Sequence, residues 1–284
     1  MTQGSIARAP TLLDGAPWIR IFPVRTPTLP PATHTNVYLI GDKRLCAIDP
    51  ASPYEDEQAA LDHAIAELAR AGERVAEIVL THHHVDHVSG AVHLAERLGV
   101  GIAAHAETAA RLRGRVAVTR LIEGGELLDF GPGGLRALHT PGHAPGHLCF
   151  VDERSRAVVA GDMVASVGTI IVEPDDGGDM AVYLASLARL RQEDASALLP
   201  AHGPPIADAR ARIDFYIAHR LEREARVLAA LSVEPRAIAA LLPAAYPDVA
   251  PAIYPLAARS LLAHLLKLER DGRARRDGDA WALA

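Results

Sequence analysis

Short apolar runs alternate with stretches of helical periodicity over the first two thirds of the chain. The runs predict buried strands at residues 18–22, 35–40, 45–48, 75–80, 100–104 and 197–199. The periodic stretches predict helices at residues 53–71, 88–98 and 179–191. Residues 121–160 are short runs broken by Gly and Pro, which favours a second, antiparallel sheet. The pattern predicts an α/β (α+β) core with two sheets.

Beyond residue 205 the pattern changes to helices. Residues 208–231 and 257–270 have helical spacing, and short pieces broken by prolines lie between them. Residues 272–283 predict two short strands around a turn. Helices followed by a hairpin are the order of a winged helix. The expected segments are an N-terminal extension at 1–17, a core at 18–205, and a helical linker with a winged-helix-like domain at 206–284.

The composition is that of an ordinary globular protein. Apolar residues make up 49% and charged residues 23% of 284 positions, and the net charge is -6. This charge argues against a polycation that binds nucleic acid, but it leaves a local basic surface open. The two cysteines, Cys46 and Cys149, lie in strand-like runs and are expected to be small core residues. Without a secretory-type apolar segment or a membrane-length apolar run, we expect a cytoplasmic protein.

Residues 81–87 are the part of the chain with the clearest chemistry. They read Thr-His-His-His-Val-Asp-His and place His82, His84, Asp86 and His87 directly after the predicted strand at 75–80. Open α/β sheets bind their ligands at strand ends, and imidazole with carboxylate suits zinc, iron or manganese. A bound cation would compensate these ionisable groups. We therefore expect a metal site in this loop, with His83 outside the ligand set.

Three further residues share this context of an apolar run, a sharp turn and a metal-type side chain. His143 follows Thr-Pro-Gly, Asp162 follows an apolar run ending in Gly161, and His202 follows the strand at 197–199. The repetition of one context predicts that these side chains converge on the same site.

In this order, the seven residues resemble the metallo-β-lactamase superfamily. The resemblance implies a four-layer αββα sandwich with metals at one edge of the two sheets. It implies that His82, His84 and His143 hold a first ion, that Asp86, His87 and His202 hold a second, and that Asp162 bridges the two. Two divalent ions are expected, zinc first, with manganese or iron as alternatives.

A narrower resemblance extends over nearly the whole chain. Residues 161–169, 179–187, 200–204 and 260–272 are similar to the β-lactamase-like protein 2 family, which adds a winged-helix-type domain to the hydrolase core. Animal members of that family are described as endoribonucleases, whereas related fungal members release polyketides as thioesterases. The resemblance therefore leaves the substrate open.

The complete ligand set predicts metal-assisted hydrolysis by a hydroxide that two ions share. Asp162 and Asp86 are the expected catalytic carboxylates, the first as the metal bridge and the second orienting the nucleophile. Tyr183 is a candidate for the substrate pocket, although its helical spacing suits core packing equally well. A purely regulatory metal-binding role is disfavoured, because the ligand set of an open catalytic site is intact.

Two substrate classes remain. The first is an ester or thioester of a small-molecule or carrier-bound acyl group, which fits because a thiolate leaves without a general acid. The alternative is a zinc-dependent endoribonuclease of single-stranded RNA that uses a basic cluster near the C-terminus. The members of this cluster are Lys267, Arg270, Arg273, Arg275 and Arg276, interleaved with acids typical of a solvated helix end. Winged helices also form dimer contacts, so a homo-oligomer is open as well.

Overall fold

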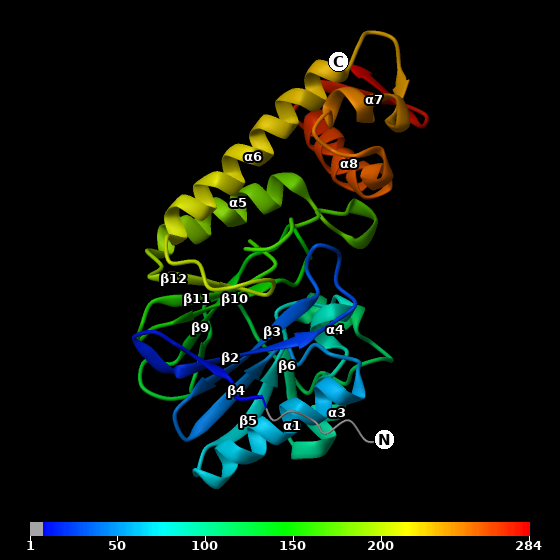
Figure 1. Cartoon of the computed structure of the whole chain (residues 1–284). Coiled ribbons are helices and arrows are strands. Elements are labelled where there is room, and N and C mark those ends of the chain that lie inside the picture. The colour runs from blue at the N-terminus through cyan, green and yellow to red at the C-terminus, as the bar shows by residue number, and fades with distance from the viewer. Residues whose placement is uncertain (1–7) are drawn as a thin grey trace. The chain divides into compact units, whose positions relative to one another are not determined.

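The computed structural model describes residues 8–284, which form two compact units (Figure 1). Unit 1 comprises the described residues up to 140 together with 146–169 and 194–209. Unit 2 comprises residues 141–145, 170–193 and 210–284. Unit 1 contains two sheets and unit 2 contains one.

Unit 1 begins with a seven-stranded mixed sheet in the order β1 to β7. The strands are β1 (Thr11–Leu13), β2 (Ala16–Arg25), β3 (His34–Gly41), β4 (Arg44–Ile48), β5 (Arg74–Val79), β6 (Ile102–Ala104) and β7 (Arg120–Leu121). Strands β1 to β4 are antiparallel, and β4 to β7 run parallel. The sheet therefore starts before the first predicted strand, and β7 belongs here, although residue 121 was expected in the second sheet.

The second sheet of unit 1 has the order β12-β11-β10-β9-β8. Its strands are β8 (Leu127–Leu128), β9 (Leu135–His139), β10 (Leu148–Asp152), β11 (Ala157–Gly161) and β12 (Ala197–Pro200). Strands β8 to β11 pair antiparallel, which confirms that prediction, and β12 adds a parallel edge to β11. The parallel pairing matters for the site, because the carboxyl ends of β11 and β12 meet at one edge.

Two apolar layers hold unit 1 together. One lies between the sheets and includes Ile19, Tyr38, Phe150 and Leu199, all at most 1% exposed. The other packs α1 (Glu55–Arg70) and α3 (Ala91–Leu98) over the first sheet, and the short helix α4 (Ala106–Arg111) follows β6. Both cysteines are fully buried, which confirms their prediction as small core residues.

The helix predicted at 88–98 is divided in two. A single turn, α2 (Val85–Val88), precedes α3, which begins only at Ala91. The physical reason lies at Gly90, whose amide donates to the carbonyl oxygen of Pro50 at 2.9 Å. A Cβ there would lie 2.6 Å from this oxygen, so only glycine fits the close approach. As a result His87 lies in its own turn and not at the start of the long helix.

Unit 2 contains the predicted winged-helix elements. Its helices are η1 (Pro174–Asp176), α5 (Met180–Leu190), η2 (Arg191–Glu193), α6 (Ala209–Ala230), α7 (Ile238–Ala245), η3 (Pro251–Ile253) and α8 (Tyr254–Arg270). Strands β13 (Arg236–Ala237), β15 (Ala280–Leu283) and β14 (Ala274–Asp277) pair in that order. The apolar faces of α6, α7 and α8 and the buried ring of Trp281 form one core. No helix among the described residues is long and apolar enough to span a membrane.

A buried histidine in this core makes the stability of unit 2 dependent on pH. His264 is 0% exposed, and its Nδ1 lies 3.8 Å from a carboxylate oxygen of Glu224. Burial, helped by the guanidinium groups of Arg220 and Arg223, holds the pKa of His264 below its ordinary value despite Glu224. The unfolded chain therefore binds this proton first, and stability should fall as the pH drops below about 6.5.

This expectation can be measured by urea unfolding between pH 5 and 8, followed by fluorescence. The chain has two tryptophans, so Trp18→Phe leaves Trp281 as a reporter of the unit 2 core. In that background His264→Phe should flatten the acid side of the stability profile, whereas His63→Phe, at an exposed helical histidine, should not. An unchanged slope in His264→Phe would refute the assignment.

Candidate metal centre

The candidate residues lie where strands of both sheets end. The 81–87 loop follows β5, Asp162 follows β11, and His202 follows β12. The neighbouring pairs β4–β5 and β11–β12 are parallel, so their carboxyl ends bring polar side chains to one edge of each sheet. A backbone hydrogen bond from Leu148 to the carbonyl oxygen of Thr81, at 2.9 Å, joins the two edges.

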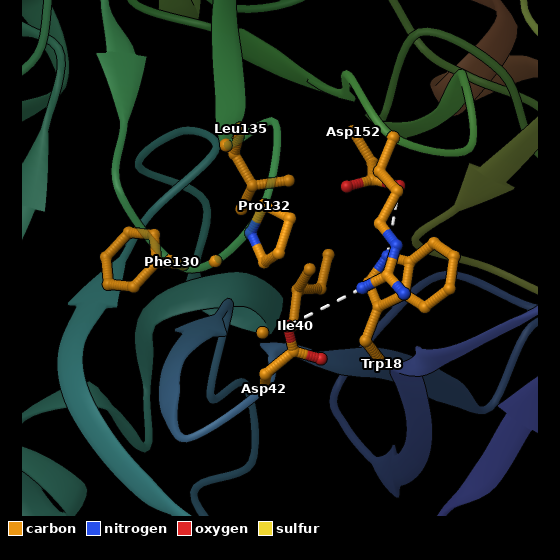
Figure 2. Close-up of a pocket in the computed structure, with 11 residues that line it drawn as sticks. Trp18, Ile40, Asp42, Phe130, Pro132, Leu135 and Asp152 are labelled. Atoms are coloured by element: carbon orange, nitrogen blue, oxygen red, sulfur yellow. Dashed lines mark hydrogen bonds and ion pairs between the residues drawn. The ribbon is translucent and has the colours of Figure 1, made fainter.

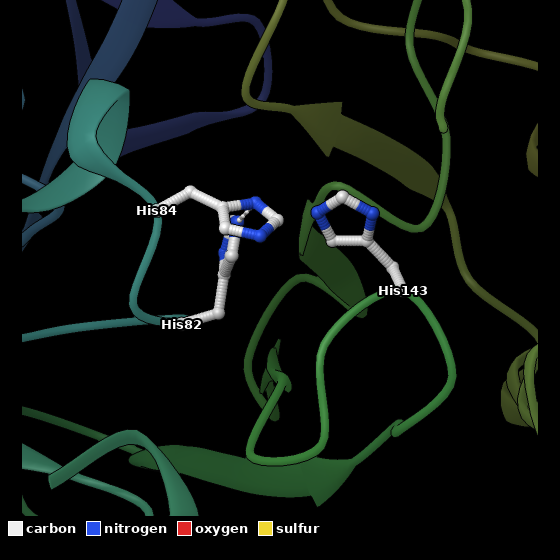
Figure 3. Close-up of side chains that lie close together, drawn as sticks. All are labelled: His82, His84 and His143. Atoms are coloured by element: carbon white, nitrogen blue, oxygen red, sulfur yellow. Dashed lines mark hydrogen bonds between the residues drawn. The ribbon is translucent and has the colours of Figure 1, made fainter. Parts of the chain in front are cut away.

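One group of ligand atoms comes from His82, His84 and His143, which lie within 4.8 Å of one another (Figure 3). Nε2 of His82 is 2.9 Å from Nδ1 of His84. The Nδ1 atom of His143 donates to the carbonyl oxygen of Ile171 at 2.7 Å. This bond fixes the tautomer and leaves Nε2 of His143 with a lone pair for a metal.

Two further groups share His87. His82, His87 and Asp162 form one, and Asp86, His87 and His202 form the other, each with ligand atoms within 4.8 Å. Nε2 of His202 lies 3.6 Å from Asp86 and 3.5 Å from Asp162. The structure thus brings all seven predicted residues into groups that can hold a cation. Their division between two ions, with Asp162 as the bridge, stays a prediction.

Asp49 is a supporting residue that the sequence reasoning missed. Its buried carboxylate accepts three hydrogen bonds, from the amide and the hydroxyl of Thr81 at 2.8 and 2.6 Å and from Nδ1 of His87 at 2.8 Å. The hydroxyl of Thr81 in turn accepts from Nδ1 of His82 at 2.9 Å. With Nδ1 of each ring engaged in this way, Nε2 is the atom that would bind a metal when the imidazole is neutral. The available signal was an acid directly after the apolar strand β4, the same context as Asp162 after β11.

The carboxylates and imidazoles at this edge shift each other's pKa values. Burial is the largest influence on Asp162, but the imidazoles of His202 and His87 outweigh it and hold the pKa of its carboxyl well below the usual range. Burial opposes protonation of His87, yet Asp162 and Asp49 raise its pKa well above the ordinary value. His202 shows the same balance. Burial lowers its pKa, but the carboxylate of Asp162 outweighs this effect, so the pKa is raised. In the metal-free protein imidazolium ions supply the positive charge that the carboxylates need.

The donor set also fits divalent ions directly. Nε2 of His87 is buried without a hydrogen-bond partner among residues 8–284, while its Nδ1 is occupied by Asp49. A buried nitrogen in this position is costly unless it binds a ligand. Imidazole and carboxylate donors together suit zinc, manganese or iron, as the sequence suggested.

Tyr183 is fully buried in α5, so its assignment to a substrate pocket stays a prediction. A separate small pocket, with a cavity volume of about 10 Å³, lies between the turns at the other ends of the strands (Figure 2). There Nε1 of Trp18 donates to Asp152 at 3.1 Å, and the guanidinium of Arg154 lies 3.5 Å from the centre of the Trp18 ring. These groups have partners among themselves, so this cavity is not the metal centre.

A mixed α/β sandwich with histidines and carboxylates gathered at one edge defines a class of candidate metal-binding α/β proteins, and comparison with known proteins specifies the family. Residues 30–202 match the metallo-beta-lactamase superfamily, and residues 237–281 match the beta-lactamase associated winged helix domain. The chain belongs to the metallo-beta-lactamase superfamily and carries a C-terminal winged helix domain. The predicted fold class is thereby confirmed.

Individual relatives agree with this placement. The atrochrysone carboxyl ACP thioesterase AgnL7 of Paecilomyces divaricatus is 33% identical over 69% of the chain, and the match spans 59% of that relative's length. A metallo-beta-lactamase family protein from Thermus thermophilus superposes with a TM-score of 0.77 at 28% identity, covering 94% of this chain and 99% of that one. The protein TTHA1623, solved in a di-iron-bound form, is 30% identical, with a TM-score of 0.52, over 68% of this chain and 98% of its own.

Proposed function

We propose that the protein is a binuclear metal-dependent thioesterase that releases an acyl group from a carrier thiol. The observation that carries the proposal is the convergence of seven histidine and aspartate side chains into three overlapping groups with ligand atoms within 4.8 Å. The overlap of the groups at His82 and His87 suits two adjacent ions. The di-iron form of TTHA1623 supports two metals, and the name of the thioesterase AgnL7 supports a carrier-bound acyl substrate.

Divalent ions bound here would polarise the scissile carbonyl and lower the pKa of water to about 7, which supplies a nucleophile at neutral pH. The protein's own groups fix the geometry. Asp49 and the hydroxyl of Thr81 hold the rings of His87 and His82, and Asp162 faces His87 and His202 at 3.5 Å. Asp86 lies 3.6 Å from His202, a position that suits the proposed role of its carboxylate in orienting water. A thiolate leaves without a proton donor, so this reaction needs no separate general acid.

Single-stranded RNA is the less favoured substrate. The cations of the C-terminal cluster all lie between 2.7 and 3.9 Å from carboxylates of unit 2. The pairs are Lys267 with Glu224 and Asp271, Arg270 with Asp179, Arg273 with Glu224, Arg275 with Asp277, and Arg276 with Asp279. A surface whose positive charges are paired offers little attraction for phosphates.

The proposal predicts metal-dependent cleavage of thioesters. Protein stripped with a chelator should lose activity on a panel of acyl thioesters at least about a hundredfold and recover it with zinc, manganese or iron. His82→Ala should stay inactive after metal is added, whereas His63→Ala, at an exposed helical histidine, should behave as wild type. The same preparations are assayed on a single-stranded RNA. Metal-dependent RNA cleavage without thioester cleavage would overturn the substrate assignment, and activity that survives chelation would overturn the mechanism.

A further inference from the structure

His147 is a buried histidine outside the predicted ligand set, and its hydrogen bonds define its tautomer. Its Nε2 lies 3.1 Å from the backbone amide of Asp162, and its Nδ1 lies 2.8 Å from the hydroxyl of Thr140. A backbone N–H can only donate, so Nε2 is the acceptor. The neutral ring therefore carries its hydrogen on Nδ1 and donates it to Thr140. The Thr140 hydroxyl is itself 3.3 Å from the thiol of Cys149.

This side chain lies between the two loops that carry the metal-type residues. Its ring centre is 5.2 Å from that of His82, which follows β5 in the first sheet. Its Nε2 bonds the amide of Asp162, which follows β11 in the second sheet. The next residue, Leu148, donates its amide to the carbonyl oxygen of Thr81 at 2.9 Å. One fully buried ring thus contacts a ligand loop from each sheet.

The residue before Asp162 is shaped around this ring. Gly161 has a φ of 48°, and a Cβ on it would lie 2.5 Å from Nε2 and 3.0 Å from Cε1 of His147. A buried imidazole held at both nitrogens has no room to move away. Glycine at 161 therefore lets the ring reach the amide of Asp162, and the ring in turn restrains the backbone from which the Asp162 carboxylate projects.

We propose that His147 is a positioning residue that orients Asp162 for metal binding by accepting its backbone N–H. The Asp162 side chain has few rotatable bonds, so a rotation of its peptide unit would move the oxygen that now lies 3.5 Å from both His87 and His202. Groups that orient metal ligands contribute about 10- to 100-fold to metal affinity. The inference rests on the proposed function, because the carboxylate that His147 positions is the proposed bridge.

The test compares two replacements of His147 that differ in whether the side chain can accept a hydrogen bond from Asp162. His147→Gln keeps an oxygen that can accept from Asp162, whereas His147→Phe keeps a ring of similar volume without an acceptor. Thr140→Val removes the partner of Nδ1, and Thr119→Val is its control, because that hydroxyl bonds the backbone of Ile102 at the start of β6. For each full-length protein the measurements are melting temperature without metal, zinc stoichiometry, zinc affinity by chelator competition, and the absorption spectrum with cobalt.

His147→Phe and Thr140→Val should weaken zinc binding by about 10- to 100-fold and alter the cobalt spectrum, while His147→Gln should stay within a few-fold of wild type. If His147→Phe lowers only the melting temperature and binds zinc as wild type does, His147 is structural and the inference fails. Failure of the proposed function is a different result, because wild type would then bind fewer than two zinc ions, or Asp162→Ala would keep the wild-type stoichiometry.

Discussion

Asp162→Asn should lower kcat by about a thousandfold or more and reduce the number of bound metal ions. Asparagine has the shape of aspartate and keeps one oxygen, so the loss is that of the negative charge. In the folded protein this charge faces Nε2 of both His87 and His202 at 3.5 Å. Metal ions supply several kcal/mol of stabilisation to a hydrolytic transition state. A loss of about 4 kcal/mol corresponds to about a thousandfold in rate.

The measurement is kcat on a thioester with zinc in excess, together with metal content after gel filtration. Asp152→Asn is a matched control, because Asp152 is another buried aspartate of unit 1 that bonds Trp18 and Ser155 far along β10 from the site. It should change stability but leave the metal content at the wild-type value. Full activity in Asp162→Asn would show that this carboxylate is not required and that the two-metal proposal is wrong.

The sequence indicated the ligand positions because strand ends have a local signature. A buried strand is an apolar run, and a histidine or aspartate directly after it, as at His82, Asp162 and His202, must face the sheet edge. The same local logic predicted both sheets and the winged-helix elements. These features depend on a few neighbouring residues, so periodicity and turn residues were enough to find them.

The residues that orient the ligands depend instead on contacts that are distant in sequence. Asp49 is 38 positions from His87, and His147 is 15 positions from Asp162. The sequence identified Asp49 only as the end of a strand. It allowed His147 a supporting role beside the metal site but favoured an ordinary buried histidine. The break between α2 and α3 has the same origin, since it depends on Gly90 meeting the carbonyl oxygen of Pro50. Pattern reasoning along one segment cannot find a partner that arrives through folding.

Asp49→Asn should weaken zinc binding by about 10- to 100-fold, because it changes which nitrogen of the His87 ring carries the hydrogen. Asp49 accepts from Nδ1 of His87 at 2.8 Å, which leaves the lone pair of His87 on Nε2, toward Asp162. The amide of asparagine places an NH₂ group within reach of that Nδ1. A ring that accepts from this group carries its hydrogen on Nε2, where a metal needs the lone pair. The same exchange beside the histidine of a Ser-His-Asp triad lowers kcat by about 10⁴.

The backbone conformation at position 49 tolerates asparagine without added strain. Asp49 has a φ of 50°, a left-handed conformation that asparagine adopts as readily as aspartate, so the exchange adds no strain. The metal-free protein should nevertheless lose about 3–5 kcal/mol of stability, because a buried imidazolium loses one of its carboxylate partners. Zinc affinity by chelator competition and urea unfolding of the metal-free protein measure the two effects separately. If Asp49→Asn binds zinc with wild-type affinity, His87 does not bind metal through Nε2. If zinc affinity falls but the metal-free protein keeps its stability, His87 is neutral in the metal-free protein.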